Sequence, residues 1–247
     1  MIIKKPDGRL WEIDLLRGIA VVAMICFHFT YDLKYFSLVD PEVYSGYVVY
    51  LSNLIPVTFL ILAGVSLTIS YSKAKEKLTK KEIKIKYIKR GLEVFFLGMV
   101  ITIISIIALP ELFIIFGILH CIGISIIFSI PFIKYRLTNL FLGFFIVGLG
   151  VYLKFFTFDF NFLVPFGFLP HHFASIDYFP IFPWFGVVLI GIAIGNFAFP
   201  NAKRSFSIRD FSTNYVIKGM CFIGRHSLLI YFLHQPILIG LIFLLLM

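Results

Sequence analysis

The sequence is poor in charged residues, and this scarcity indicates which class of protein it encodes. Only 14% of its 247 residues are Asp, Glu, Lys or Arg, where about 25% is usual in a soluble domain. In contrast, 60% are hydrophobic, and the mean hydropathy is +0.98. A water-soluble globule would leave much of that apolar surface wet, and a disordered chain would be far more polar. The composition excludes both classes and predicts an all-α, polytopic membrane protein with one domain over residues 1–247.

Other absences narrow the function. The three cysteines, Cys26, Cys121 and Cys221, form no CxxC pair and no ligand spacing, so we expect neither a disulfide framework nor a metal site. Acidic residues number 13 against 22 basic ones, which gives a net charge of +9. Lys and Arg gather on the cytoplasmic side of bilayer proteins, so this excess predicts a membrane orientation and no nucleic-acid partner. No internal repeat is visible, whereas many transporters are built from repeated halves.

Seven stretches are long and apolar enough to span a bilayer, which takes about 20 residues. They cover residues 15–33, 47–71, 91–109, 112–130, 137–155, 181–199 and 227–247, with a tight hairpin at Pro110–Glu111. If the basic loop 73–90 is cytoplasmic, the N-terminus is inside and the C-terminus outside, and only Lys34 and Lys154 of the 22 basic residues lie on the outer side. We expect a multi-pass plasma-membrane protein whose longest outer loop, about 157–180, is a lid or binding surface.

The first predicted span carries polar residues that are costly in a membrane and are therefore functional candidates. Arg17 and His28 are eleven residues apart, which places them on one helical stripe about 16 Å apart. Asp14 and Asp32 stand at contact spacing from Arg17 and His28, respectively. A carboxylate one turn from an imidazole can orient it as a general base. The alternative is that these are buried polar pairs that hold helices together, or that Asp32 is wet at the outer surface.

Two more histidines, His120 and His234, fall toward the interior of later spans. Each could line a polar cavity shared with the first span, or simply form an interhelical hydrogen bond. Arg17, Arg90 and Arg225 lie near cytoplasmic span ends, where they predict either a cationic mouth for a phosphorylated ligand or snorkelling to lipid phosphate. Arg225 and His234 are nine residues apart, on opposite sides of a continuous helix, unless the turn at 224–226 is irregular.

Three classes fit a polar cavity with a basic inner mouth. The first is an enzyme that moves a group from a cytosolic donor to an acceptor across the membrane. The second is a proton-coupled small-molecule transporter that uses the intramembrane histidines. The third is a structural or receptor protein, although a retinal protein is disfavoured because the last span has no lysine for a Schiff base.

Several segments resemble the heparan-α-glucosaminide N-acetyltransferase-like family of transmembrane acyltransferases. Residues 9–20 and 28–33 are similar to its first-helix signature, and segments 116–125, 178–186 and 224–236 follow in order along the chain. The Arg17-x10-His28 spacing also resembles a pattern of the broader acyltransferases.

This resemblance implies acyl transfer from cytosolic acyl-CoA, in particular acetyl-CoA, to a hydroxyl or amine, commonly on a sugar, at the outer face. His28 would be the catalytic histidine, and Arg17 a conformational or donor-binding arginine. The remaining matched positions would line the tunnel: His120, Arg225, His226 and His234. The residues agree with such chemistry, because cations suit the phosphates of CoA and Asp32 could stabilise a His28 imidazolium. Direct transfer and an acyl-His relay both stay open, as does a homodimer.

Overall fold

The computed structural model describes residues 10–40, 42 and 46–246 and, in them, eight α-helices and two short 3-10 helices. The α-helices are α1 (Trp11–Tyr35), α2 (Tyr47–Lys75), α3 (Lys80–Ala108), α4 (Ile118–Phe128), α5 (Leu137–Leu153), α6 (Ile181–Ala198), α7 (Tyr215–Arg225) and α8 (Ser227–Leu246). The 3-10 helices are η2 (Val164–Phe166) and η3 (Pro200–Ala202). Lys4, Lys5 and Arg9, predicted to lie inside, and Met247, the predicted end of the last span, lie outside the described residues.

The predicted all-α membrane class is confirmed. Over the described ranges the structure has no named strand, and five helices are long and apolar enough to cross a bilayer: α1, α2, α3, α6 and α8. The apolar helices α4 and α5 are shorter, at 11 and 17 residues, where a span takes about 20. The count of seven spans and the orientation of the termini stay predictions.

The surface is strongly apolar, as expected of a chain embedded in lipid. Ile107 of α3 is 80% exposed, Phe144 of α5 61% and Leu245 of α8 79%. Such side chains would be an aggregation hazard in water, whereas hydrocarbon solvates them at no cost.

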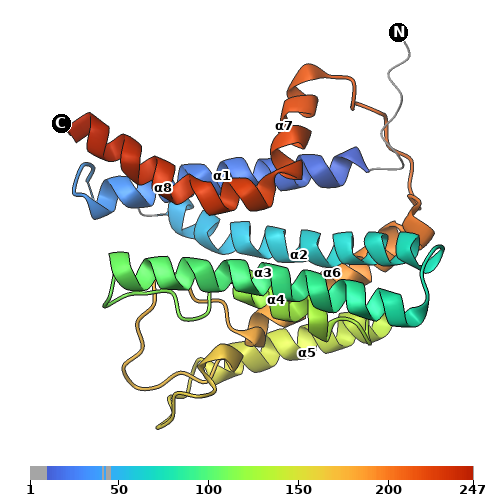
Figure 1. Cartoon of the computed structure of the whole chain (residues 1–247), viewed down its shortest axis with the longest axis horizontal. Coiled ribbons are helices and arrows are strands. Elements are labelled where there is room, and N and C mark those ends of the chain that lie inside the picture. Colours follow the sequence, from blue (N-terminus) through green and yellow to red (C-terminus); the bar gives the residue numbers. More distant parts are fainter. Residues whose placement is uncertain (1–9, 41, 43–45, 247) are drawn as a thin grey trace. The chain divides into compact units, whose positions relative to one another are not determined.

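Two compact units make up the chain. The first contains residues 1–59 and 208–247, with α1, the beginning of α2, α7 and α8, and the second contains residues 60–207. Within the first unit α1 packs on α7 and α8, and within the second α3 packs on α4 and α5 on α6 (Figure 1).

Glycines allow the helices of the second unit to approach closely. A Cβ atom on Gly186 of α6 would lie 2.5 Å from the carbonyl oxygen of Gly143 of α5, and one on Gly91 of α3 would lie 2.7 Å from that of Gly123 of α4. Small residues at such crossings are typical of membrane helices, because van der Waals packing rather than the hydrophobic effect drives their association.

The basic segment 73–90, predicted as a loop, is mostly helix, which corrects that expectation. α2 runs to Lys75, and α3 begins at Lys80 rather than near Gly91. The physical reason is a capping box: the Glu82 N–H donates to Thr79 Oγ1 (3.3 Å), and the Thr79 N–H donates to Glu82 Oε2 (2.8 Å). α3 therefore extends its apolar part by about three charged turns.

The fourth predicted span starts later than expected. The chain turns tightly at Pro110–Glu111 as predicted, with the Leu112 N–H donating to the Leu109 carbonyl (3.1 Å), but extended backbone rather than helix follows this turn. Thr102 Oγ1 donates to the Ile114 carbonyl (2.7 Å), and the Ile114 N–H donates to Ser105 Oγ (2.9 Å). From the other side, Ser175 Oγ donates to the Phe113 carbonyl (3.0 Å). These bonds satisfy extended backbone that would otherwise be unpaired, so residues 112–117 do not enter the helix and α4 begins at Ile118.

The segment between α5 and α6 is irregular, as predicted for 157–180, apart from η2. The Tyr178 hydroxyl donates to the Val164 carbonyl (2.6 Å), and burial raises the pKa of this phenol. His171 contacts Asp159, with 3.2 Å between Nε2 and Oδ1, while its Nδ1 lies 3.0 Å from Thr157 Oγ1. The segment thus carries its own internal order. Its role as a lid or binding surface stays a prediction.

Candidate functional site

The first unit brings two of the predicted histidines into contact. His28 on α1 and His234 on α8 have ring centroids 4.8 Å apart, with their planes at 60°. His28 is half-buried and His234 is 8% exposed. Two imidazoles at this distance, on neighbouring apolar helices, form the centre of the candidate site.

The hydrogen bond of His234 fixes its tautomer. Its Nδ1 lies 2.5 Å from the Tyr231 carbonyl oxygen. Because a carbonyl only accepts, Nδ1 carries the proton in the neutral ring, and Nε2 keeps its lone pair. Nε2 is buried and has no hydrogen-bond partner among the described residues. His234 therefore presents a buried proton acceptor.

Asp32 is held by α8 instead of by His28, which corrects the predicted pairing. Its Oδ1 accepts a 2.7 Å hydrogen bond from Gln235 Nε2, and no bond or ion pair joins Asp32 to His28 in the described structure. The spacing allowed contact within α1, but Gln235 offers a donor on the facing helix. Gln235 is a site residue that sequence reasoning missed, although it stands between His234 and Pro236 in a segment already singled out.

Unpaired polar atoms gather around these side chains. Asp32 Oδ2 and Gln235 Oε1 are buried and lack a hydrogen-bond partner in the described part of the chain, as does His234 Nε2. A buried polar atom left unsatisfied costs about 1–3 kcal/mol. Three such atoms on two adjoining helices leave hydrogen-bonding capacity that water or a polar ligand can use.

Arg17 and Arg225 both belong to the packing region of α1 and α7. Arg17 Nη1 lies 3.4 Å from Asp14 Oδ1, which confirms the predicted pair. Burial raises the pKa of the Cys221 thiol, and the Asp14 carboxylate adds to this effect while Arg225 opposes it. Charges from both helices therefore act at one thiol, whose Sγ donates to the Trp11 carbonyl (3.3 Å).

Arg225 and His234 do not lie on one continuous helix. The sequence leaves open whether the turn at 224–226 is irregular. α7 ends at Arg225 and α8 begins at Ser227, with His226 between them. The His226 N–H donates to the carbonyls of Phe222 and Ile223 (3.2 and 3.1 Å), which closes α7. The turn is irregular, so the opposite-side argument for a continuous helix does not apply.

His120 belongs to the second unit and has the opposite hydrogen-bonding pattern. It is 2% exposed at the start of α4, and its Nδ1 accepts a 3.1 Å hydrogen bond from the Gly117 N–H. In the neutral ring Nε2 therefore carries the proton, and this buried donor lacks a partner in the described ranges. Phe95 and Phe116 hold the ring, with centroids 5.2 and 5.4 Å away.

The segment between α5 and α6 positions the first turn of α4, which carries His120. Asp177 Oδ2 accepts a 3.2 Å hydrogen bond from the Ile118 N–H, and the Phe179 N–H donates to the Phe116 carbonyl (2.8 Å). A carboxylate at a helix N-terminus also meets the favourable end of the helix dipole.

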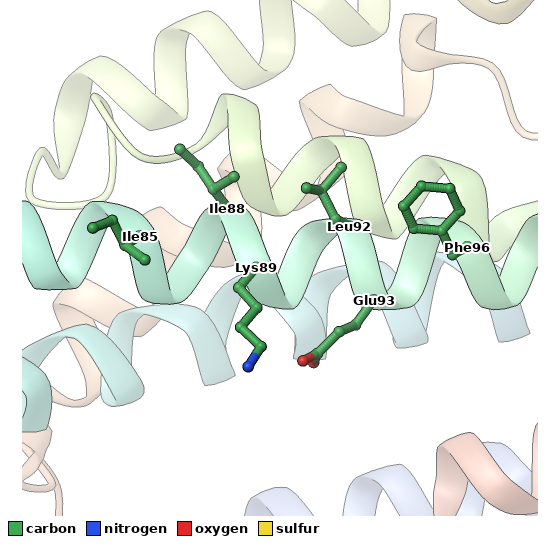
Figure 2. Close-up of a pocket in the computed structure, with 6 residues that line it drawn as sticks. All are labelled: Ile85, Ile88, Lys89, Leu92, Glu93 and Phe96. Atoms are coloured by element: carbon green, nitrogen blue, oxygen red, sulfur yellow. The ribbon is translucent and has the colours of Figure 1, made fainter.

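Arg90 stands apart from the histidines on the surface of α3. Its Nη1 lies 3.5 Å from Glu93 Oε2, with both side chains about half exposed, at 54% and 48%. Glu93 and Lys89 lie on one side of a shallow groove on α3, opposite Leu92 and Phe96 (Figure 2). This groove contains none of the predicted site residues. The structure thus places Arg17 and Arg225 in one unit and Arg90 in the other.

Over the described residues, no group of three or more His, Cys, Asp or Glu side chains is arranged to hold a metal ion. The side chains gathered at the candidate site are two imidazoles, a carboxylate and an amide.

Comparison with known proteins places the chain in a family. A search of curated proteins and a search of solved structures each gave no match. A family model described as heparan-alpha-glucosaminide N-acetyltransferase, catalytic, matches residues 9–236. The match covers nearly the whole chain and includes α1 and the part of α8 that carries His234. The chain therefore belongs to the heparan-α-glucosaminide N-acetyltransferase family, a family of membrane acetyltransferases.

Proposed function

We propose that this protein transfers an acetyl group from cytosolic acetyl-CoA to an amine or hydroxyl of a sugar-type acceptor at the outer face of the plasma membrane, with His28 as the catalytic histidine. One observation carries the proposal: His28 contacts His234, and the buried atoms Nε2 of His234, Oδ2 of Asp32 and Oε1 of Gln235 have no partner in the described structure. Acyl transfer needs a proton acceptor and hydrogen-bonding groups at one place, and this cluster supplies both.

The reaction follows from these groups. The acceptor nitrogen or oxygen forms a bond to the thioester carbonyl carbon, and the carbon–sulfur bond breaks. His28 takes the proton that the acceptor loses and returns a proton to the leaving thiolate of CoA, so the imidazole ends as it began. In an acyl-His relay, the imidazole nitrogen would form the first bond and the acceptor would attack second.

Neighbouring side chains would have distinct parts in this proposal. Gln235 fixes Asp32 through the 2.7 Å bond, and the free Asp32 Oδ2 is left to accept a hydrogen bond from the acceptor substrate and to stabilise an imidazolium. His234, whose Nε2 lone pair is free, assists proton transfer to and from His28. His120 contributes a buried donor, its Nε2–H, for the acyl donor.

The cations serve the donor in this proposal. Arg17 and Arg225 in the first unit, and Arg90 in the second, are the arginines that the basic side of the chain offers to the phosphates of CoA. The same charge bias supports a cytoplasmic N-terminus, an outer C-terminus and seven spans.

Purified protein in proteoliposomes tests this function directly. With acetyl-labelled acetyl-CoA and glucosamine, we expect labelled acetyl-glucosamine and an equal amount of free CoA thiol. Thiol release no faster than in protein-free vesicles, for both amine and hydroxyl acceptors, would overturn the proposal. Glucosamine uptake driven by a pH gradient without acetyl-CoA would instead support the proton-coupled transporter.

Arg225→Gln is expected to weaken CoA binding roughly tenfold or more, because a hydrogen bond between charged groups contributes about 1.5–3 kcal/mol. Titration calorimetry with CoA and with dephospho-CoA measures this change and shows whether the 3′-phosphate is the partner. Lys154→Gln is the matched control, since it removes one exposed charge from the end of α5, on the predicted outer side. Equal CoA affinity in wild type and Arg225→Gln would contradict a phosphate-binding role.

A further inference from the structure

The short helix α7 was not among the predicted elements and has an unusual setting. It has 11 residues, and it crosses α1 steeply rather than running alongside it as α8 does (Figure 1). The packing uses one narrow face. A Cβ atom on Gly18 of α1 would collide with the Met220 carbonyl of α7, and one on Gly224 with the Asp14 carbonyl. If α1 spans the bilayer, a helix across it lies close to the membrane plane.

The remaining faces of α7 are sharply divided. Lys218 and Arg225 are seven residues apart and share one edge, since seven residues amount to nearly two full turns. Val216 and Ile223 share another edge by the same spacing, roughly opposite the first. Val216 is 71% exposed although it is apolar. α7 therefore has a cationic edge and an apolar edge, separated by the face on α1.

Two contacts show which way these edges point. Cys221, on the side of the cationic edge, reaches the carbonyl of Trp11, the first residue of α1. Met220, on the side of the apolar edge, lies against Gly18, about 10 Å further along α1. The cationic edge thus points toward the beginning of α1 and the apolar edge toward its middle. This is the order in which a helix end passes from water through headgroups into hydrocarbon.

Aromatic side chains occupy the face of α7 that points away from α1. Tyr215 is 87% exposed and Phe222 57%. They also stand seven residues apart, on the same face. The Lys218 Nζ lies 5.3 Å from the centroid of the Tyr215 ring. Aromatic rings beside cations are typical of the membrane–water interface, where ring bodies meet lipid and charges meet phosphate.

We propose that α7 lies flat in the bilayer interface at the end where α1 begins, with Lys218 toward the phospholipid phosphates and Val216 and Ile223 in the upper acyl chains. Arg225 lies at the same depth on the cationic edge, where it serves the CoA phosphates if the proposed function holds. We assign phospholipid to the surface of α7 that does not pack on α1. The cationic edge lies toward the end of α1, where headgroups are expected, and the apolar edge lies toward its middle, where acyl chains are expected. α7 thereby fixes the depth of α1, to which Gly18 and Gly224 join it. This inference stands whether or not the chain transfers acetyl groups.

Depth-dependent quenching tests the arrangement on the full chain in phosphatidylcholine nanodiscs. Val216→Cys and Lys218→Cys are each labelled with bimane in a Cys26→Ala background; Cys121 and Cys221 are buried. We expect a nitroxide on the lipid acyl chain to quench the label at 216 about twofold more than the label at 218, and aqueous iodide to show the reverse order.

Three results would overturn the proposal. Equal iodide quenching at both positions without lipid quenching would place α7 in water, and equal lipid quenching without iodide quenching would bury it. Stronger lipid quenching at 218 than at 216 would show that the cationic edge, and not the apolar edge, faces the acyl chains. Ile223→Cys repeats the measurement on the apolar edge should Val216→Cys lower thermal stability, and an unchanged melting profile of each labelled protein is the control for folding.

Discussion

Replacing His28 with alanine is expected to lower the rate of acetyl transfer by about 10²–10⁴-fold, the range that a positioned general base or acid contributes. The methyl side chain cannot take the proton of the acceptor, and His234 is held by the Tyr231 carbonyl on its own helix. CoA thiol release and acetylated product measure the loss. Because His28 is half-buried and forms no hydrogen bond in the described structure, the protein should stay folded in detergent.

His172→Ala is the matched control for that experiment. His172 is an exposed histidine on the segment between α5 and α6, and its loss should leave turnover unchanged. Wild-type turnover in folded His28→Ala protein would remove the catalytic assignment. A strong loss in both variants would show that removal of any histidine is harmful and would equally count against a specific role of His28.

Gly224→Ala is expected to destabilise the protein by about 1–3 kcal/mol or more, because overpacking a tight contact costs this much. The added Cβ would collide with the carbonyl group of Asp14 and come within 2.9 Å of the Gly18 nitrogen. Both obstacles are backbone atoms of α1, which cannot rotate away as a side chain would. We expect the apparent Tm in detergent to fall by several degrees, at roughly 2–4 °C per kcal/mol for a chain of this size.

Gly219 provides the comparison on the same helix. A Cβ there would meet nothing within 4 Å, so Gly219→Ala should add helix propensity without a clash, about 0.5–1 kcal/mol of stabilisation. The two substitutions add the same methyl group five residues apart and should shift Tm in opposite directions. A common direction of change would show that the close packing of α7 on α1 does not control stability.

Hydropathy predicted much of the fold, because long apolar segments leave few alternatives to a helix. α6 and α8 begin and end within a residue of the predicted spans, and α1 contains the predicted one. The errors arise where other forces decide. The first turns of α3 are too charged to read as part of a span, but the Thr79–Glu82 capping box makes them helical. α7 is too short and too charged for a hydropathy window, and its packing glycines become visible only with α1 in place.

The site was predictable only as far as local spacing reaches. The Asp14–Arg17 pair followed from its i, i+3 spacing and is present at 3.4 Å. The His28–His234 contact joins residues over 200 positions apart, so the sequence could nominate both rings but could not place them together. Asp32 is a second example. Its spacing favoured contact with His28 on the same helix, but its hydrogen bond is to Gln235 on another helix.

Hydrogen bonds join the beginning of α4 to the segment before α6, about 60 residues further along the chain. Asp177 and the Phe179 amide hold the backbone at Phe116 and Ile118, and the intervening Gly117 amide holds the ring of His120. A substitution that removes the Asp177 carboxylate would therefore loosen the backbone that holds the buried His120 ring. The residues before α6 thus affect the environment of His120 as well as the surface of the protein.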